Sequence, residues 1–353
     1  MSQFTRLCIS YLLFAGLLLA GIFFWTANSF ITQQKPLSPL MSPDTPLHPP
    51  EDQANLIIPQ ERKRWSERIR QVGADQAYQE FKTTYAQRHF GIQHALSHLF
   101  GELIYEKEGI HGVAVCDSTF SFGCYHSFFG RAIAEGGTKT LSVLNAACEG
   151  KFGSRGTGCQ HGIGHGILEY MGHQHLQNAL DACTVIQQEQ QLFGCTSGVF
   201  MEYNVPIIIT ATTSFVRFRE FNVETPYVPC PVLPERFRSS CYHELGQWWD
   251  KFISYNKIGM LCGAVTNTQE QEACFRGVGN VAAPSSQYDV GETIKKCNEM
   301  PPTQARIFCR EAASWSFFTA PEFKEAAHRV CEGLGQDIMS RCAPSINPER
   351  KTE

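Results

Sequence analysis

Two segments of this chain carry a pair of histidines four residues apart, followed by a glutamate after another four residues. They read His94-x3-His98-x3-Glu102 and His161-x3-His165-x3-Glu169. Residues at i and i+4 lie on the same face of a helix. Two imidazoles in that arrangement can bind one metal ion from a single helix.

A repeating register relates further polar residues to these pairs. Six cysteines open similar segments of the chain, namely Cys124, Cys159, Cys195, Cys241, Cys274 and Cys309. Positions +2 and +6 from each of them share one helix face. These positions hold His126/Gly130, His161/His165, Ser197/Met201, His243/Gln247, Arg276/Asn280 and Glu311/Trp315, and the same count from Ile92 gives His94/His98. We therefore expect His126 to project toward the same side as both pairs.

The sharpest hypothesis is a transition-metal site. Its predicted ligands are His94, His98, His126, His161 and His165, with Glu169, Glu202 and His243 as additional candidates. Such donors suit one ion of zinc, copper or iron, and an open coordination position would let a metal-bound water support hydrolysis or redox chemistry. The alternative is a polar groove whose histidines cap helix starts and bond to the backbone. Packed helices lie about 8–10 Å apart, so the register alone does not bring the rings together.

No established catalytic signature accompanies the histidines. The sequence has no HExxH, no GxSxG, no P-loop and no CxxCH, and it identifies no catalytic residue. Gly277-Val-Gly-Asn-Val-Ala282 imitates a dinucleotide fingerprint but opens a predicted helix instead of following a strand. The net charge of −4 and the lack of a basic stripe argue against a nucleic-acid partner.

The cysteines indicate how the histidines are held. Of 15 cysteines, Cys8 lies in an apolar N-terminal run, which leaves an even number in the body, and none is in a CxxC motif. Regular, wider spacing predicts disulfides and an oxidising compartment, either the periplasm or the extracellular space.

The cysteine spacing also predicts the fold class. Seven cysteines close successive units, namely Cys116, Cys148, Cys183, Cys230, Cys262, Cys297 and Cys331, at intervals of 32, 35, 47, 32, 35 and 34 residues. A period near 34 is the size of two helices and their turns. We therefore predict an all-α solenoid of αα-hairpin repeats over residues 84–343, with one disulfide per repeat.

Two pairing schemes are open. Joining each closing cysteine to the next opening one leaves none over and gives Cys116–Cys124, Cys148–Cys159, Cys183–Cys195, Cys230–Cys241, Cys262–Cys274, Cys297–Cys309 and Cys331–Cys342. Joining the two ends of each hairpin is sterically feasible but orphans Cys116 and Cys342. We prefer the first scheme, in which each bond staples one repeat to the next and closes a loop worth about 2–3 kcal/mol.

Cysteine pairs that bracket the turn between hairpins resemble the secreted, cysteine-rich relatives of the tetratricopeptide repeats. Cys116-Asp-Ser-Thr-Phe-Ser-Phe-Gly-Cys124 shows the tightest version of that spacing. The resemblance covers most of residues 84–343 and concerns architecture, since His161-Gly-Ile-Gly-His165 is not part of that family's pattern. It implies a solenoid with a concave binding surface.

One unit departs from the repeat. Residues 204–229 contain a β-branched run in place of a second helix, which explains the interval of 47 residues. Such an insertion is typical of a binding loop or lid, and a strand that fills a gap in the core is the equal alternative.

The N-terminal part predicts a membrane attachment. Residues 7–30 carry no charge and are long enough to cross a bilayer, with residues 1–6 in the cytoplasm. An uncleaved anchor is favoured over a cleaved signal peptide. A Pro-rich linker follows at 31–60, then a basic amphipathic helix at 61–83 whose charges face solvent or an anionic surface, and residues 344–353 form a tail.

Together these features predict a single-pass membrane protein with an extracytoplasmic helical-repeat body. The leading functional hypothesis is binding or scaffolding of a protein, peptide or envelope ligand on the concave face. The alternative is a metal-dependent enzyme or metal-handling protein centred on the histidines, and the sequence does not decide whether the protein is an enzyme. Convergence of the imidazoles within coordination distance would favour the metal.

Overall fold

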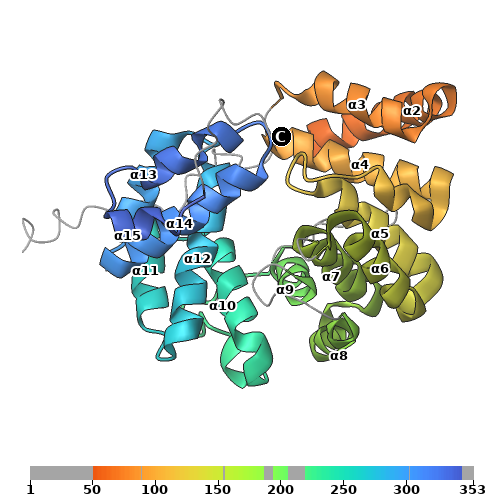
Figure 1. Ribbon diagram of the computed structural model, residues 1–353. Coiled ribbons are helices and arrows are strands. Elements are labelled where there is room, and N and C mark those ends of the chain that lie inside the picture. The colour runs from red at the N-terminus through yellow and green to blue at the C-terminus, as the bar shows by residue number, and fades with distance from the viewer. Residues whose placement is uncertain are drawn as a thin grey trace, which may run out of the picture. The chain divides into compact units, whose positions relative to one another are not determined.

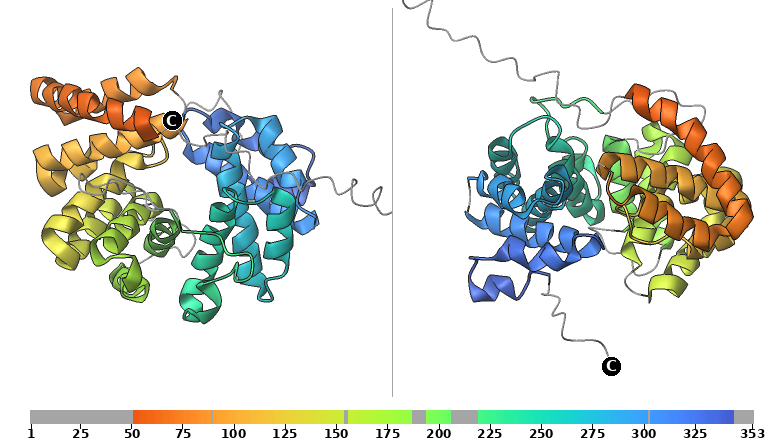
Figure 2. Two further views of the ribbon diagram at one scale, coloured as in Figure 1. Left: turned by 180° about the vertical axis from the view of Figure 1, so that it is seen from behind. Right: turned by 90° about the horizontal axis from the view of Figure 1, so that it is seen from above.

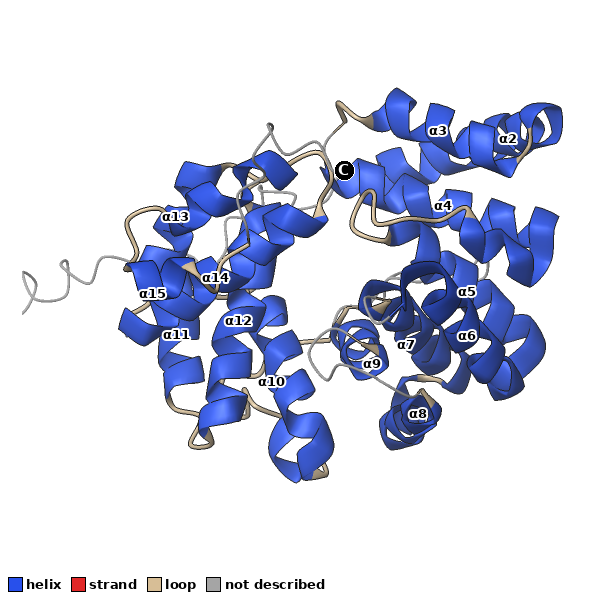
Figure 3. Ribbon diagram, in the orientation of Figure 1, coloured by secondary structure: helices blue, strands red, loops and turns tan. Residues whose placement is uncertain are grey.

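The computed structural model describes residues 51–88, 90–153, 156–186, 194–205, 219–301 and 303–343. Within these ranges the regular structure is helical and no strand is present (Figure 3). The all-α prediction is therefore confirmed. None of the helices in the described part of the chain is long and apolar enough to cross a bilayer, and the predicted anchor at 7–30 lies outside that part.

One helix from each unit packs against the corresponding helix of the next unit, and we call this succession the first-helix row (Figures 1 and 2). The row consists of α4 (Phe90–Glu108), α5 (Gly123–Gly136), α7 (Thr157–Met171), α9 (Cys195–Asn204), α10 (Glu235–Trp249), α12 (Thr268–Ser285) and α14 (Thr303–Thr319). Its interior is apolar, with large side chains such as Phe129, Phe200 and Trp249 almost fully buried. Burial of these faces is the main stabilising contribution to the stack.

The second segment of each unit is more variable than a uniform hairpin repeat predicts. Among the described residues, four units have a second α-helix, which is α6 (Leu141–Phe152), α8 (Leu176–Ala182), α11 (Tyr255–Gly263) or α13 (Val290–Asn298). The other segments between or after the helices of the row are short or 3-10 helices, some of them flanking α6 and α8, namely η1 (Gly109–Ala114), η2 (Gly137–Thr140), η4 (His173–His175), η5 (Cys183–Val185), η6 (Cys230–Val232), η7 (Lys324–Cys331) and α15 (Gln336–Met339). In the predicted insertion, residues 219–229 have no helix or strand before η6, and the β-branched run at 206–218 lies outside the described residues.

All seven disulfides of the preferred scheme are present. They join Cys116–Cys124, Cys148–Cys159, Cys183–Cys195, Cys230–Cys241, Cys262–Cys274, Cys297–Cys309 and Cys331–Cys342. The paired Cα atoms are 5.5–6.5 Å apart, within the ordinary range for a disulfide. The alternative that joins the two ends of one hairpin is wrong. The first six bonds each tie a second segment to the next helix of the row, near its start in α5, α7 and α9 and about two turns inside it in α10, α12 and α14. The seventh ties the end of η7 to Cys342, just after α15.

Glycines allow the helices of the row to approach closely. A Cβ atom on Gly164 of α7 would lie 2.0 Å from the Cys195 carbonyl oxygen of α9, and one on Gly198 of α9 would lie 1.9 Å from the His161 oxygen. Gly246 and Gly277 make the same reciprocal contacts between α10 and α12. Any larger residue would force these backbones apart, which explains why the row tolerates glycine inside its helices despite a cost of about 1 kcal/mol each.

The N-terminal segment differs from its prediction in two respects. Helix α2 (Glu51–Val72) begins inside the range assigned to the linker, and the single helix expected at 61–83 is two helices, α2 and α3 (Ala74–Tyr85). Gly73 separates them with φ of +85°, a conformation that glycine adopts without strain. The residues before 51 and after 343 lie outside the described part of the chain.

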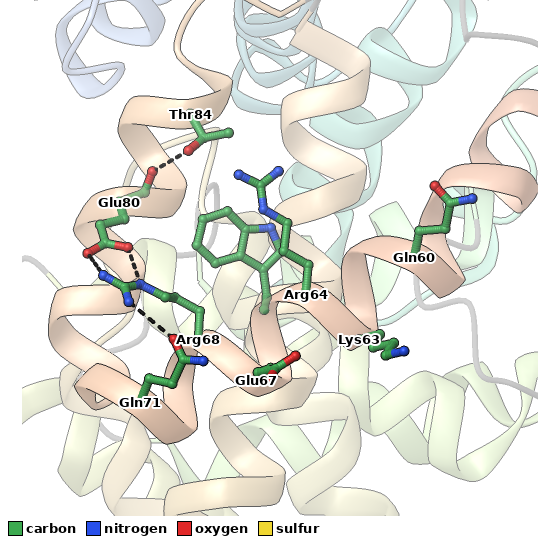
Figure 4. Close-up of a pocket in the computed structure, with 9 residues that line it drawn as sticks. Gln60, Lys63, Arg64, Glu67, Arg68, Gln71, Glu80 and Thr84 are labelled. Carbon is green, nitrogen blue, oxygen red and sulfur yellow. Dashed lines mark hydrogen bonds and ion pairs between the residues drawn. The ribbon is translucent and has the colours of Figure 1, made fainter.

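The basic run of α2 lines a surface hollow on this helix pair (Figure 4). Arg68 donates two hydrogen bonds to the Glu80 carboxylate, at 2.5 and 2.6 Å. Arg62 pairs with Glu102 and, at 3.1 Å, with Glu106 of α4. Two of the basic side chains are thus neutralised by partners within the protein, and the contact of this helix with solvent or with an anionic surface stays a prediction.

Candidate metal centre

The histidines of each HxxxH motif face one another across one helical turn. His94 and His98 form the α4 pair, whose Nε2 atoms are 3.1 Å apart. His161 and His165 form the α7 pair, whose Nε2 atoms are 3.0 Å apart. Two nitrogens bound to one zinc ion at about 2.0–2.1 Å each are separated by roughly 3.0–3.4 Å, so both pairs have the spacing of adjacent ligands.

His126 of α5 lies between the two pairs. Its Nδ1 atom is 3.2 Å from Nε2 of His98, and its ring centroid is 5.2 and 5.0 Å from the rings of the α4 pair. On the other side it is 5.8 and 4.6 Å from the rings of the α7 pair. The five rings, which we call the histidine cluster, contain two groups of three that can each hold an ion, and His126 belongs to both groups.

Acceptors outside the cluster fix the orientation of three of these rings. His94 Nδ1 donates to the carbonyl oxygen of Phe120 at 2.8 Å, and His165 Nδ1 to the Glu202 carboxylate at 2.8 Å. His161 Nδ1 is 3.1 Å from the hydroxyl oxygen of Ser197. An N–H bond from the far ring nitrogen to a carboxylate, hydroxyl or carbonyl is the usual support of a metal-bound histidine.

The α7 pair is fixed in the tautomer that metal binding requires. The Ser197 hydroxyl uses its own proton in a 2.6 Å bond to Glu244, so its oxygen accepts the Nδ1 proton of His161. Glu202 accepts the Nδ1 proton of His165. A neutral imidazole has only one N–H, and each Nε2 therefore carries a bare lone pair. These two lone pairs face each other at 3.0 Å, where a shared cation would remove their repulsion.

Burial keeps the rings in their neutral form. It lowers the pKa of His161 and His165 to about 3, reinforced by the charge of neighbouring histidines. Burial also lowers the pKa of His94 and, more strongly, of His126. The neutral imidazole is the form that binds metals. His126 and His165 are buried, whereas His94 and His161 keep partial exposure, so the cluster reaches from solvent into the interior.

Close helix crossings explain why the rings converge. A Cβ atom on Gly162 would lie 2.9 Å from the Phe129 ring of α5, and one on Gly166 would lie 3.0 Å from the Phe129 backbone. Gly164, between them, meets α9 in the same way. Helix α7 is therefore held tightly between α5 and α9, and this brings the α7 pair within reach of His126 on one side and of its outer acceptors on the other.

The three additional candidate ligands, Glu202, His243 and Glu169, lie outside the two groups of three that can hold an ion. Glu202 supports His165 and is a positioning residue in this arrangement. His243 is not among the residues grouped with the cluster, because its Nδ1 donates to Glu244 at 2.9 Å and its Nε2 accepts from Asn280 at 2.9 Å. Glu169 also lies outside both groups, and burial together with nearby carboxylates raises its pKa to about 7.

Sequence reasoning missed three supporting groups, which are Ser197, Glu244 and the Phe120 carbonyl. Ser197 occupies the +2 position of the register, so its place on the histidine face was readable. Glu244 follows His243 directly in the sequence, and no motif marked it as a partner of Ser197. Phe120 belongs to a turn in which it and the next two residues have φ between 52° and 61°. Such positive φ angles are usually found at glycine, and none of these three residues is a glycine, so the turn could not be predicted from the sequence.

Comparison with known proteins adds no relative: no family model, no curated protein and no solved structure matches this chain. The resemblance to cysteine-rich tetratricopeptide-like repeats therefore holds as a disulfide-rich helical architecture. The functional argument has to come from the site itself.

Proposed function

We propose that this protein binds transition-metal ions through its histidine cluster, in the oxidising, extracytoplasmic compartment that its disulfides suggest. Of the metals expected from the sequence, copper and zinc are the two we propose, because imidazole suits both ions and copper(II) heads the affinity order for nitrogen ligands. Bound metal would supply a Lewis acid or, for copper, a redox centre. Whether the protein stores metal or catalyses a reaction with it depends on that ion.

The facing Nε2 atoms of the α7 pair carry this proposal. Hydrogen-bonding histidines of a polar groove would point their lone pairs at donors. Here two lone pairs are held toward each other by acceptors on α9, at a cost that a bound cation would offset. The low pKa of both rings works against a proton in that position.

Metal analysis tests the proposal. The full chain is exported so that its disulfides form, purified without a histidine tag, and compared with the His161→Ala/His165→Ala variant. The matched control is His173→Ala/His175→Ala, which removes two imidazoles of η4 in the same unit, where His175 is exposed. We expect stoichiometric copper or zinc in the wild type and the control, and a loss of at least one equivalent in the α7-pair variant. A folded wild type that takes up no copper or zinc on addition would refute it.

Binding of a protein, peptide or envelope ligand is the second candidate function. One observation favours it: Val223, Val228 and Val232, on the segment that joins α9 to α10, are exposed by 68%, 45% and 82%. Exposed apolar side chains that form one contiguous patch are typical of a docking surface, and these three lie within ten residues of one another in the sequence. Anchoring by residues 7–30 stays a prediction in either case. A metal-free result in the experiment above would make this candidate the leading one.

A further inference from the structure

We propose that His126 bridges two metal ions, one held by the α4 pair and the other by the α7 pair, with one of its ring nitrogens on each ion. This inference rests on the proposed metal binding and specifies its form, a dinuclear centre with a shared imidazole. A single ion bound to one of the two groups is the alternative that it replaces.

The position of His126 is the first observation behind the bridge. The two groups that can hold an ion share this residue and no other. The α4 pair and the α7 pair belong to helices that both pack against α5, and the ring of His126 extends from α5 between them. Its Nδ1 atom is assigned to the α4 side by its 3.2 Å distance from His98 Nε2, which leaves Nε2 for the α7 side.

The hydrogen bonding of His126 is the second observation. A terminal histidine ligand usually donates its far N–H to a carboxylate, a carbonyl or a water, as His94, His161 and His165 do here. For His126, the hydrogen bond found within the described residues is the one to His98, inside the cluster. Its side chain is 3% exposed. A buried imidazole with no outer acceptor in the described part of the chain fits a ring whose two nitrogens both serve as ligands.

The charge balance of the site is consistent with two ions. To bind both, the neutral His126 ring gives up its remaining N–H proton to solvent and becomes an anionic imidazolate. That negative charge lies directly between two dications and reduces their mutual repulsion. The carboxylates of Glu202 and Glu244 supply further negative charge, one through His165 and the other through Ser197, which lowers the cost of placing charged ions in a mostly buried site.

Copper(II) loading of the full chain tests the bridge, because an imidazolate between two copper(II) ions couples their unpaired electrons antiferromagnetically. We expect two equivalents of tightly bound copper by elemental analysis. We also expect an electron paramagnetic resonance signal that integrates to fewer than two spins per protein and falls further on cooling. One equivalent, or two equivalents with two full spins at every temperature, would overturn the bridge and leave metal binding intact. No bound copper would overturn the bridge, and it would refute the proposed function as well if zinc also fails to bind.

Substitution of His126 distinguishes two copper ions that it bridges from two ions that only lie near each other. His126→Gln keeps a polar side chain of similar size but offers no second ring nitrogen. We expect it to retain its disulfides and helical circular dichroism, and either to recover the full spin count for its bound copper or to lose one ion. The control His173→Ala/His175→Ala should keep the coupled signal. Two copper ions that remain coupled in His126→Gln would overturn the proposal.

Discussion

The histidine cluster and the C-terminal part of the first-helix row are built on the same plan and filled with different chemistry. Reciprocal glycine contacts join α7 to α9 and also α10 to α12, and disulfides of closely similar separation anchor the helices in both regions. In the C-terminal region the polar side chains at the equivalent positions complement one another. His243 has a partner on each ring nitrogen, and the buried Glu311 accepts from Arg276 at 2.9 Å and pairs with Arg341 at 2.7 Å.

The cluster shows the opposite arrangement, in which lone pairs of the same kind face one another. The chain itself supplies the cation beside Glu311, whereas under the proposed function the cation between the histidines would come from outside. The difference teaches that close helix packing does not define the site. What differs is the residues at the +2 and +6 positions and the acceptors that hydrogen-bond to them. These determine whether the polar side chains between two helices satisfy one another or leave lone pairs available to a ligand.

The largest expected effect is on metal-dependent stability. A ligand present at a hundred times its dissociation constant stabilises the folded state by about 2.7 kcal/mol, which raises the melting temperature of a chain of this size by on the order of 5 °C. We expect added zinc to raise the melting temperature of wild type and of His243→Gln, and to raise that of His161→Gln/His165→Gln by a clearly smaller amount, because only the α4 pair remains to bind it. Melting is followed by circular dichroism after removal of metal with a chelator. An equal increase in the α7-pair variant would place the stabilising ion elsewhere.

The second prediction compares glycines with the same packing role. Gly164→Ala and Gly246→Ala each place a methyl group against a backbone oxygen, where the Cβ would lie 2.0 and 2.4 Å away. Overpacking of this kind costs about 1–3 kcal/mol, so both variants should show a lower free energy of unfolding. Only Gly164→Ala should also weaken metal binding, because it separates α7 from the acceptors on α9. Chemical denaturation and metal titration measure the two effects, and equal metal affinity in both variants would contradict the role given to the α7 crossing.

Much of the scaffold was readable from the sequence because covalent geometry constrains it. The closing and opening cysteines recur at nearly constant spacing, and one pairing scheme uses all of them, so the disulfides followed from counting. The convergence of the histidines did not follow. Register places His126, His161 and His165 on a common side, but whether their rings meet depends on how closely the helices cross. That distance is set by Gly162, Gly164 and Gly166 together with their partners on neighbouring helices.

Irregular parts of the chain were the least predictable. The break at Gly73 lies within an otherwise continuous amphipathic pattern, and η1 and η7 are 3-10 segments where the repeat period predicts full α-helices. The left-handed turn at Phe120–Phe122 is formed by residues that rarely adopt positive φ. Its carbonyl holds His94, so a supporting group of the site comes from a conformation that tertiary packing imposes and local sequence does not indicate.

The third prediction compares two buried carboxylates. Glu202→Gln removes the charge that supports His165, and loss of an outer partner of a metal ligand typically costs about 10- to 100-fold in metal affinity. Glu311→Gln should leave metal affinity unchanged and lower stability instead, because Arg276 and Arg341 lose their charged partner. Competition with a chromophoric chelator measures the affinities. Wild-type affinity in Glu202→Gln would show that the carboxylate does not tune the site.

The smallest expected effect concerns two buried hydroxyl groups. Ser197→Ala leaves the Nδ1 proton of His161 without its acceptor, whereas Ser314→Ala removes a hydroxyl that bridges Ala327 and Ala343 in the C-terminal region. A hydrogen bond of this kind contributes about 1 kcal/mol net, so both variants should lose comparable stability. Only Ser197→Ala should also lower metal affinity, by about fivefold, since His161 is then free to carry its proton on Nε2, the atom that has to bind the ion. The effect should vanish in the His161→Gln/His165→Gln background, where there is no pair to orient. A loss of the same size there would mean that Ser197 acts on the fold and not on the tautomer of His161.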